Sequence, residues 1–242
     1  MSDPAPAGDA AVAACARGEA AWNRLALAAL ELPSFEDDGM WWRRDPASPV
    51  LFAGVSTARG ARVPADIGPG QVRDSFGDLD LPGWTAKPSD PWMLREPAPI
   101  PPLQVEGLVL DHAVNPDEVW VFERTAIRGA LGEEGVAQFA PFSIHGRESG
   151  QVPGLRLLIG KLDGIPVATS IAARWKGGVC VSGVMVVASA RRRGIGAAMT
   201  CAALRAAPDV PASLCASALG FGVYERLGFR EVGRGVDWSP PA

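Results

Sequence analysis

The side chains best suited to chemistry gather in residues 184–199, which read VMVVASARRRGIGAAM. Three arginines stand directly before Gly194 and Gly196, and an alanine-rich segment typical of a helix follows. The glycines let a ligand approach backbone N–H groups, and the start of a helix adds unpaired amides and the positive end of the helix dipole. The segment therefore predicts an anion site suited to a diphosphate. The alternative is an ordinary strand–loop–helix turn with surface arginines.

Two common phosphate-binding patterns do not fit this segment. A dinucleotide-binding fingerprint needs G-x-G-x-x-G, and the third glycine is missing. A P-loop needs G-x-x-x-x-G-K-[ST], and no such lysine is present. The spacing therefore excludes a dinucleotide-binding fingerprint and a P-loop.

Two motifs together resemble the GNAT superfamily, the Gcn5-related N-acetyltransferases. Arg191, Gly194 and Gly196 match the first motif, R-x-x-G-x-G. Residues 217–229 resemble the later motif N-x-x-A-x-x-x-Y-x-x-x-G-F, with Tyr224 and the pair Gly228-Phe229 in place. The chain departs from the pattern at three positions, which hold Ala188 for a usual proline, Ser217 for asparagine and Gly220 for alanine. The resemblance covers about residues 103–242.

This resemblance implies an acetyl-CoA-dependent N-acetyltransferase that acts on a primary amine by direct attack. Backbone groups near Met185, Val186 and Val187 would pair with the pantetheine arm of acetyl-CoA. The diphosphate would be wrapped mainly by backbone amides of Arg191, Arg192, Arg193, Gly194, Ile195, Gly196 and Ala197. Ser217 would lie near the cofactor, and Tyr224 would protonate the departing thiolate. Tyr224 could instead be a packed helix residue, and Ser217 a helix N-cap.

The general base is not evident. Many relatives carry a glutamate on the strand before the diphosphate loop, but residues 179–187 hold no carboxylate. The region that lines the acceptor pocket in relatives contains His145, Glu148, Glu118 and Glu123. His145 is the best single candidate because its ordinary pKa lies near neutrality. Deprotonation through water is the alternative.

The elements around these residues predict an α/β (α+β) fold of the GNAT type, with a mixed, mostly antiparallel sheet flanked by helices. We expect strands over 103–113, 155–162, 165–175, 179–187, 212–216 and 229–238. Helices are expected at 196–207, at 219–227, at 133–142, and after an Asn115 N-cap with Pro116 in the first turn. Asp163-Gly164 between two β-rich runs indicates a hairpin.

The first hundred residues predict a separate accessory region. Residues 1–9 read as a disordered leader, 9–32 as a helix capped by Asp9, 39–42 and 50–55 as short strands, and 71–79 as a short helix. Residues 84–102 contain six prolines and predict an extended connector. We therefore divide the chain into 1–100, which in outline resembles a degenerate GNAT-like half-domain, and a GNAT domain over 103–242.

Composition limits the classes of partner. The net charge of −4 gives no reason to expect nucleic acid, and no apolar run is long enough to span a membrane. The four cysteines form no C-x-x-C pair and lie far in sequence from the two histidines, so we expect no metal. The start of the chain lacks a positive region, which predicts a cytoplasmic protein. The expected partner is a small-molecule or peptide amine, and a homodimer stays open.

Two other functions remain alongside acetyl transfer. The same fold could move a longer acyl chain or an aminoacyl group. A non-catalytic CoA-binding or regulatory module is the alternative from another class, because no carboxylate lies on the strand before the loop.

Overall fold

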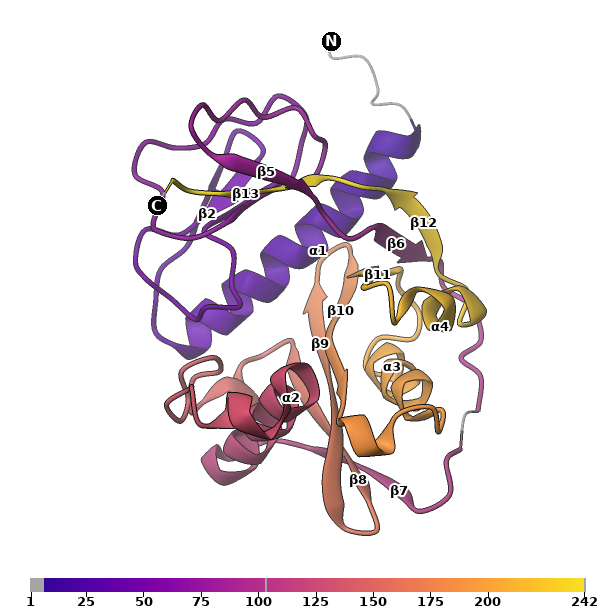
Figure 1. Cartoon of the computed structure of the whole chain (residues 1–242). Helices are drawn as coiled ribbons and strands as arrows, with labels where there is room; N and C mark the ends of the chain where they lie inside the picture. The colour runs from indigo at the N-terminus through magenta and orange to yellow at the C-terminus, as the bar shows by residue number, and fades with distance from the viewer. Residues whose placement is uncertain (1–6, 103, 242) are drawn as a thin grey trace.

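The computed structural model describes residues 7–102 and 104–241, which form two β-sheets and four α-helices (Figure 1). The large sheet has the order β12-β6-β11-β10-β9-β8-β7, and the small sheet the order β1-β2-β3-β4-β13-β5. Most neighbouring strands are antiparallel; β10/β11 and β3/β4 are parallel. The predicted mixed, mostly antiparallel α/β fold is confirmed.

The elements have the following bounds. The helices are α1 (Ala7–Ala29), α2 (Pro116–Val136), α3 (Ile195–Arg205) and α4 (Phe221–Arg226). The large sheet contains β12 (Arg230–Gly233), β6 (Trp92–Arg95), β11 (Ala212–Cys215), β10 (Gly178–Val186), β9 (Ile165–Trp175), β8 (Leu155–Leu162) and β7 (Leu108–His112). The small sheet contains β1 (Phe35–Asp37), β2 (Met40–Trp42), β3 (Gly54–Ser56), β4 (Val72–Asp74), β13 (Val236–Ser239) and β5 (Thr85–Pro88).

Helices cover both faces of the large sheet. Successive residues of a strand point to opposite faces, so β8 buries Leu157 on one side and Leu158 on the other. Leu157 packs in a cluster with α1 and α2, which includes Leu27 and Phe122. Leu158 packs in a second cluster with α3, which includes Met199. The sheet therefore separates an α1/α2 face from an α3/α4 face.

Local sequence signals predicted most elements of the second half correctly. β8 and β9 have the predicted bounds, with the turn at Asp163-Gly164, and β10, α3, β11 and α4 lie within two residues of theirs. Asn115 caps α2: its side chain accepts from the Glu118 N–H, and the Glu118 side chain accepts from the Asn115 N–H. Gly132, with a φ of 79°, breaks α2, so the predicted helix over 133–142 is reduced to a short continuation.

Other predicted elements were wrong because their pairing partners lie far away in the chain. Residues 71–79 contain the strand β4 and not a helix, since β4 pairs with both β3 and β13. Residues 84–102 are not a plain connector: they hold β5 and also β6, which lies between β11 and β12. The four residues of β6 include no proline and leave every N–H free to pair.

The ends of the chain also differ from the prediction. Residues 1–6 of the predicted leader lie outside the described part, while Ala7 already begins α1. Asp9 is not the N-cap but lies inside α1 and pairs with Arg59. The strand expected at 103–113 shortens to β7 after a turn from Val105 to Leu108, and Leu103 lies outside the described residues. The last strand divides into β12 and β13, one in each sheet.

Candidate cofactor site

Two parallel strands pair briefly and then diverge. β10 and β11 form only the register pairs Val179↔Ala212 and Cys180↔Ser213. Beyond them β10 carries a bulge between Ser182 and Met185, and residues 182–186 are half-buried. The gap between the strands leaves backbone groups of β10 without a strand neighbour on that side. This opening can accept an extended chain such as a pantetheine arm.

The predicted diphosphate loop lies at the open end of β10. Arg192 (φ 62°) and Gly194 (φ 78°) both adopt left-handed backbone conformations, which turn the chain into α3. The first bond of α3 runs from the Ala198 N–H to the Gly194 carbonyl. The N–H groups of the first turn of α3 therefore point out of the helix, as an anion site requires.

Of the three residues expected to meet the pantetheine arm, Val186 presents its backbone to the opening. The Val187 N–H is used inside the sheet, where it donates to the Val167 carbonyl at 2.9 Å. Alternate residues of a strand point their backbone groups to opposite sides, so Val186 faces away from β9. Met185 is paired in register with Thr169 of β9. These assignments as cofactor contacts stay predictions.

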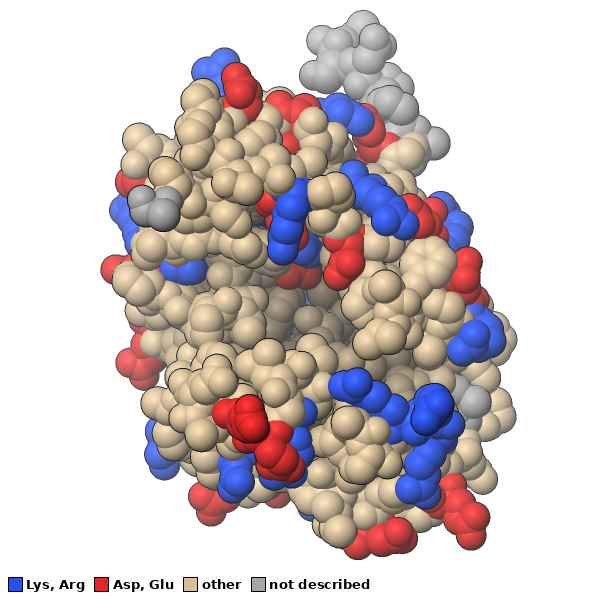
Figure 2. Space-filling model, in the orientation of Figure 1, with Lys and Arg blue, Asp and Glu red and all other residues tan. Residues whose placement is uncertain are grey.

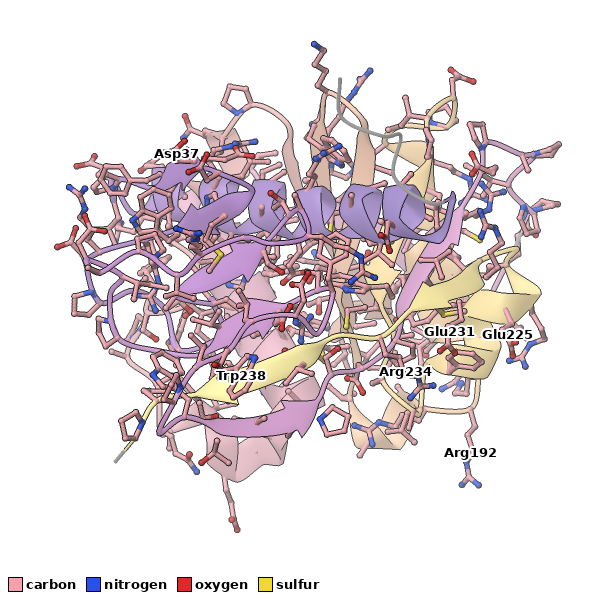
Figure 3. The ribbon with its side chains drawn as sticks, turned by 90° about the horizontal axis from the view of Figure 1, so that it is seen from above. Asp37, Arg192, Glu225, Glu231, Arg234 and Trp238 are labelled. Carbon is pink, nitrogen blue, oxygen red and sulfur yellow. The ribbon has the colours of Figure 1, made fainter. Side chains whose placement is uncertain are left out.

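Arg191 differs from the two arginines after it. Its guanidinium donates to the Val186 carbonyl (Nε, 3.0 Å) and to the Gly129 carbonyl of α2 (Nη2, 2.8 Å). The side chain therefore fastens the loop to β10 and to α2. Arg192 is exposed and extends away from the ribbon (Figure 3), and Figure 2 shows basic side chains gathered over the loop before α3. The sequence motif indicated Arg191, but not this anchoring role.

Tyr224 lies on α4 on the same face of the sheet as α3. Its ring packs edge-on against Phe229 with centroids 5.9 Å apart, and the residue is 9% exposed. Burial, and to a smaller extent the nearby Cys215 thiol, raises the pKa of the Tyr224 phenol to about 12. The phenol therefore stays protonated at neutral pH and can donate a proton.

Ser217 is exposed at the loop between β11 and α4. It is not the helix N-cap, because that position is held by Gly220. The Ser217 carbonyl instead accepts from the N–H groups of Gly220 and Phe221, at 2.9 and 3.0 Å. Its hydroxyl is thus not committed to capping α4.

The surroundings of the four candidate bases do not suit a general base. Glu118 caps α2, and Glu148 accepts from Gln151 at 2.8 Å. Glu123 is fully buried and accepts from the Ile144 N–H at 2.9 Å. His145 is buried between the rings of Trp22 and Phe122, and burial lowers its pKa to about 4. A neutral imidazole enclosed by α1 and α2 is poorly placed and weakly basic for this role.

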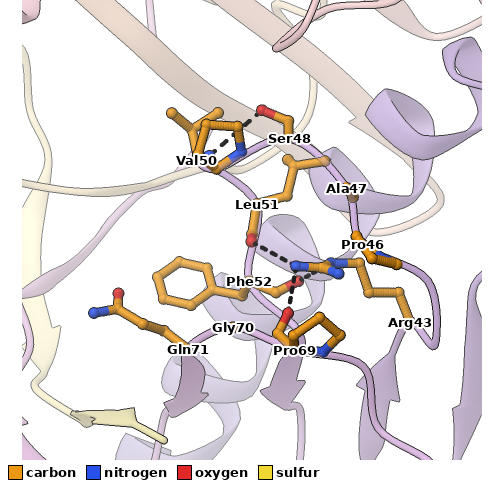
Figure 4. A pocket seen from close by; sticks show the side chains of 11 residues that line it. Arg43, Pro46, Ala47, Ser48, Val50, Leu51, Phe52, Pro69, Gly70 and Gln71 are labelled. Atoms are coloured by element: carbon orange, nitrogen blue, oxygen red, sulfur yellow. Dashed lines mark hydrogen bonds between the residues drawn. The ribbon is translucent and has the colours of Figure 1, made fainter. Parts of the chain in front are cut away.

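A cavity of about 320 Å³ lies beside the small sheet (Figure 4). Its single arginine, Arg43, donates to the carbonyls of Asp45, Leu51, Phe52 and Pro69. Because these carbonyls occupy the guanidinium, the cavity offers no free cation to an anionic ligand. Most of its other lining is apolar: Pro46, Ala47, Pro49, Val50, Leu51, Phe52 and Pro69.

Two negative findings concern the described residues. No helix over 7–102 or 104–241 is long and apolar enough to cross a membrane. Within the same ranges, no three His, Cys, Asp or Glu side chains are grouped as metal ligands would be.

Comparison with known proteins locates the fold. No family profile matches the chain, and no curated protein sequence matches it. Among solved structures, a GCN5-related N-acetyltransferase from Kribbella flavida has a TM-score of 0.60 at 19% identity, covering 94% of this chain and 96% of that one. A protein assigned to the GNAT family of acetyltransferases from Novosphingobium aromaticivorans has a TM-score of 0.58 at 20% identity, covering 94% and 99%. The chain therefore has the GNAT fold, as its motifs predicted.

Proposed function

We propose that the chain is an acetyl-CoA-dependent N-acetyltransferase that acts on a primary amine of a small molecule or peptide. The observation that carries this proposal is the opening between β10 and β11 beside the free N–H groups of α3. The opening suits an extended pantetheine arm, and the helix start with its exposed arginines suits a diphosphate. Acetyl-CoA, when bound, would supply an acetyl group activated as a thioester.

The residues of the chain would then orient the thioester and donate a proton to the leaving sulfur. The Val186 N–H and the first turn of α3 hold the cofactor in place, which aligns its carbonyl for direct attack. The phenol of Tyr224 gives its proton to the sulfur as the bond to the acetyl carbon breaks. Metal ions take no part in this proposal.

Calorimetry with acetyl-CoA and with desulfo-CoA tests whether the chain binds this cofactor. We expect acetyl-CoA to bind with one site per chain; absence of binding by the intact protein would contradict every function built on this opening. Thiol release from a panel of amines then tests catalysis. Binding without thiol release from any amine would favour the non-catalytic CoA-binding module, and release with a longer acyl or aminoacyl donor alone would favour transfer of another group.

A further inference from the structure

A carboxyl group lies where the two diverging strands part. α1 crosses the large sheet at Gly18, where a Cβ atom would overlap the Ser213 Oγ atom of β11 and lie 3.4 Å from the Cys180 Cβ atom of β10. Cys180 and Ser213 form the last register pair before β10 and β11 separate. The next residue of α1 is Glu19, which is 8% exposed. Glu19 thus lies on the α1 side of the sheet, and its charge acts on the thiols of Cys180 in β10 and of Cys215 at the end of β11.

Among the residues that the structure describes, no cation forms an ion pair with Glu19 alone. Arg73 of β4 is the guanidinium whose charge acts on it, but Arg73 is committed to Asp237 of β13 by two hydrogen bonds, at 2.9 and 3.0 Å. The Asn23 amide reaches the Glu19 Oε1 atom only at 3.4 Å and donates more closely to the Glu19 backbone carbonyl, at 2.7 Å. Two carboxylates thus share one buried guanidinium, which hydrogen-bonds to Asp237 and leaves Glu19 without an ion pair.

The cluster also reaches the β11 side of the opening. Arg73 lies over the ring of Trp92, at 5.3 Å from its centroid, and Trp92 pairs in register with Cys215, the last residue of β11. Figure 2 shows the molecule hollowed between the small sheet above and the α2–α3 half below. An amine entering on the α1 side would meet a thioester that comes through the opening from the α3 side.

We propose that the Glu19 carboxylate binds the ammonium group of the acceptor and takes its proton. This assignment rests on the proposed acetyltransferase function. Glu19 removes one proton from the ammonium group and later releases it to water. The neutral nitrogen attacks the thioester carbonyl, so that a C–N bond forms and the C–S bond breaks. The thiolate receives the Tyr224 proton, and the second proton lost by the nitrogen restores the phenol through water.

The surroundings of Glu19 strengthen it as a base. Burial raises the pKa of its carboxyl, and Asp237 raises it further, while Arg73 and the Asn23 amide lower it. The other titratable groups that face it are the Cys180 and Cys215 thiols, and burial raises the pKa of both above the ordinary value. The thiols therefore stay uncharged at neutral pH. A carboxyl with a raised pKa lies closer to the working pH and is a better proton acceptor.

The test compares Glu19→Gln with Glu123→Gln in the full-length chain. Both glutamates are buried and burial raises the pKa of each, but the Glu123 carboxylate accepts the Ile144 N–H. Thiol release from acetyl-CoA with the best amine of the panel is followed from about pH 5 to 9. We expect Glu19→Gln to lower kcat/KM by about 10²-fold or more. It should also remove the acidic limb of the pH profile, which is the fall in kcat/KM at acidic pH caused by protonation of Glu19. Acetyl-CoA binding by calorimetry should be unchanged, and Glu123→Gln should keep the acidic limb.

A second measurement does not depend on activity. In the folded chain Glu19 holds its proton above the ordinary pKa of 4.5, so its contribution to the free energy of unfolding is full below that pH. This contribution is lost as the pH rises through the folded pKa. The wild type should therefore lose stability relative to Glu19→Gln over that window. A pH-independent difference would overturn the placement of Glu19 as a poorly compensated carboxyl.

The outcomes separate the two proposals. If the wild type does not bind acetyl-CoA, the acetyltransferase function fails and Glu19 fails with it. If the wild type turns over an amine but Glu19→Gln keeps its rate and acidic limb, only the assignment of Glu19 is overturned. If Glu19→Gln does not fold, Glu19→Asp decides: a lower rate with the limb retained supports the proposal, and an unchanged rate overturns it.

Discussion

Tyr224 is the only tyrosine of the chain, and its surroundings allow a clean substitution. The ring packs against Phe229, so Tyr224→Phe keeps the packing and removes only the hydroxyl. We expect thiol release to fall by about 10²-fold or more, because the leaving thiolate loses its proton donor. Since burial raises the phenol pKa to about 12, ionisation of Tyr224 should not reduce the wild-type rate near neutral pH.

Binding of acetyl-CoA is the control for this substitution. It should keep its wild-type affinity in Tyr224→Phe, since the predicted cofactor contacts come from β10 and the start of α3. A variant that binds acetyl-CoA and still releases thiol at the wild-type rate would exclude Tyr224 as the acid.

At the scale of single residues, sequence motifs predict the loop before α3 and Tyr224 as site residues, but no motif indicates Glu19. Gly194, Arg191 and Tyr224 belong to short motifs whose spacing is set by the local turn and helix. Glu19 belongs to no motif, and Arg73 and Asp237, which surround it, come from distant strands. The available signal was a polar pair four residues apart, Glu19 and Asn23, within an alanine-rich helix.

The Arg191 side chain joins the loop between β10 and α3 to two neighbouring elements. Arg191→Ala removes the hydrogen bonds to the Val186 and Gly129 carbonyls, which join the loop to β10 and α2. Hydrogen bonds from a charged donor contribute about 1.5–3 kcal/mol each. We expect acetyl-CoA binding to weaken roughly tenfold or more by calorimetry, since a loosened loop must be ordered again on binding.

Arg192→Ala is the matched control, because it removes the same charge from the same loop. The Arg192 side chain extends away from the ribbon (Figure 3), so this variant should weaken binding only through lost electrostatic attraction. Raising the salt concentration should reduce that smaller effect. Equal losses in the two variants would show that charge alone, and not anchoring by Arg191, governs the site.

Elements built from local signals were predictable, and elements built by distant pairing were not. The hairpin of β8 and β9 follows from Asp163-Gly164, and the start of α2 follows from its Asn115–Glu118 capping box. β4 and β6 are short strands with sheet neighbours from the other end of the chain: β13 lies beside β4, and β11 and β12 lie beside β6. Nothing within four residues distinguishes such a strand from a loop, because its stability comes from its partners.

At the scale of the whole molecule, the two sheets exchange strands. β6 enters the large sheet from the first hundred residues, and β13 enters the small sheet from the end of the chain. The predicted boundary near residue 100 is therefore crossed by pairing in both directions, although the division of the chain into two regions stays a prediction. α1 packs against strands of the large sheet and against β3 of the small sheet. Glu19 of α1 and Arg73 of β4 therefore lie at the junction of the two sheets.

The buried pair Arg73–Asp237 should hold β13, from the end of the chain, against β4 in the small sheet. Its partners are 164 residues apart and both side chains are 8% exposed. Asp237→Asn leaves the buried Arg73 guanidinium without its hydrogen-bonded carboxylate, and Glu19 compensates its charge only in part, so we expect the free energy of unfolding to fall by up to about 3–5 kcal/mol. Equilibrium denaturation measures this change, with tryptophan fluorescence and far-ultraviolet circular dichroism followed together.

The exposed pair Arg234–Glu231, at 2.9 Å, supplies the comparison. Glu231→Gln breaks an ion pair that water already screens, so its effect should stay below about 1 kcal/mol. Because the strand exchange makes each sheet depend on the other, both probes should follow one transition in the wild type and in both variants. If fluorescence and circular dichroism separated in Asp237→Asn, the small sheet would be able to unfold alone, and the junction around Glu19 would be a movable contact between two regions.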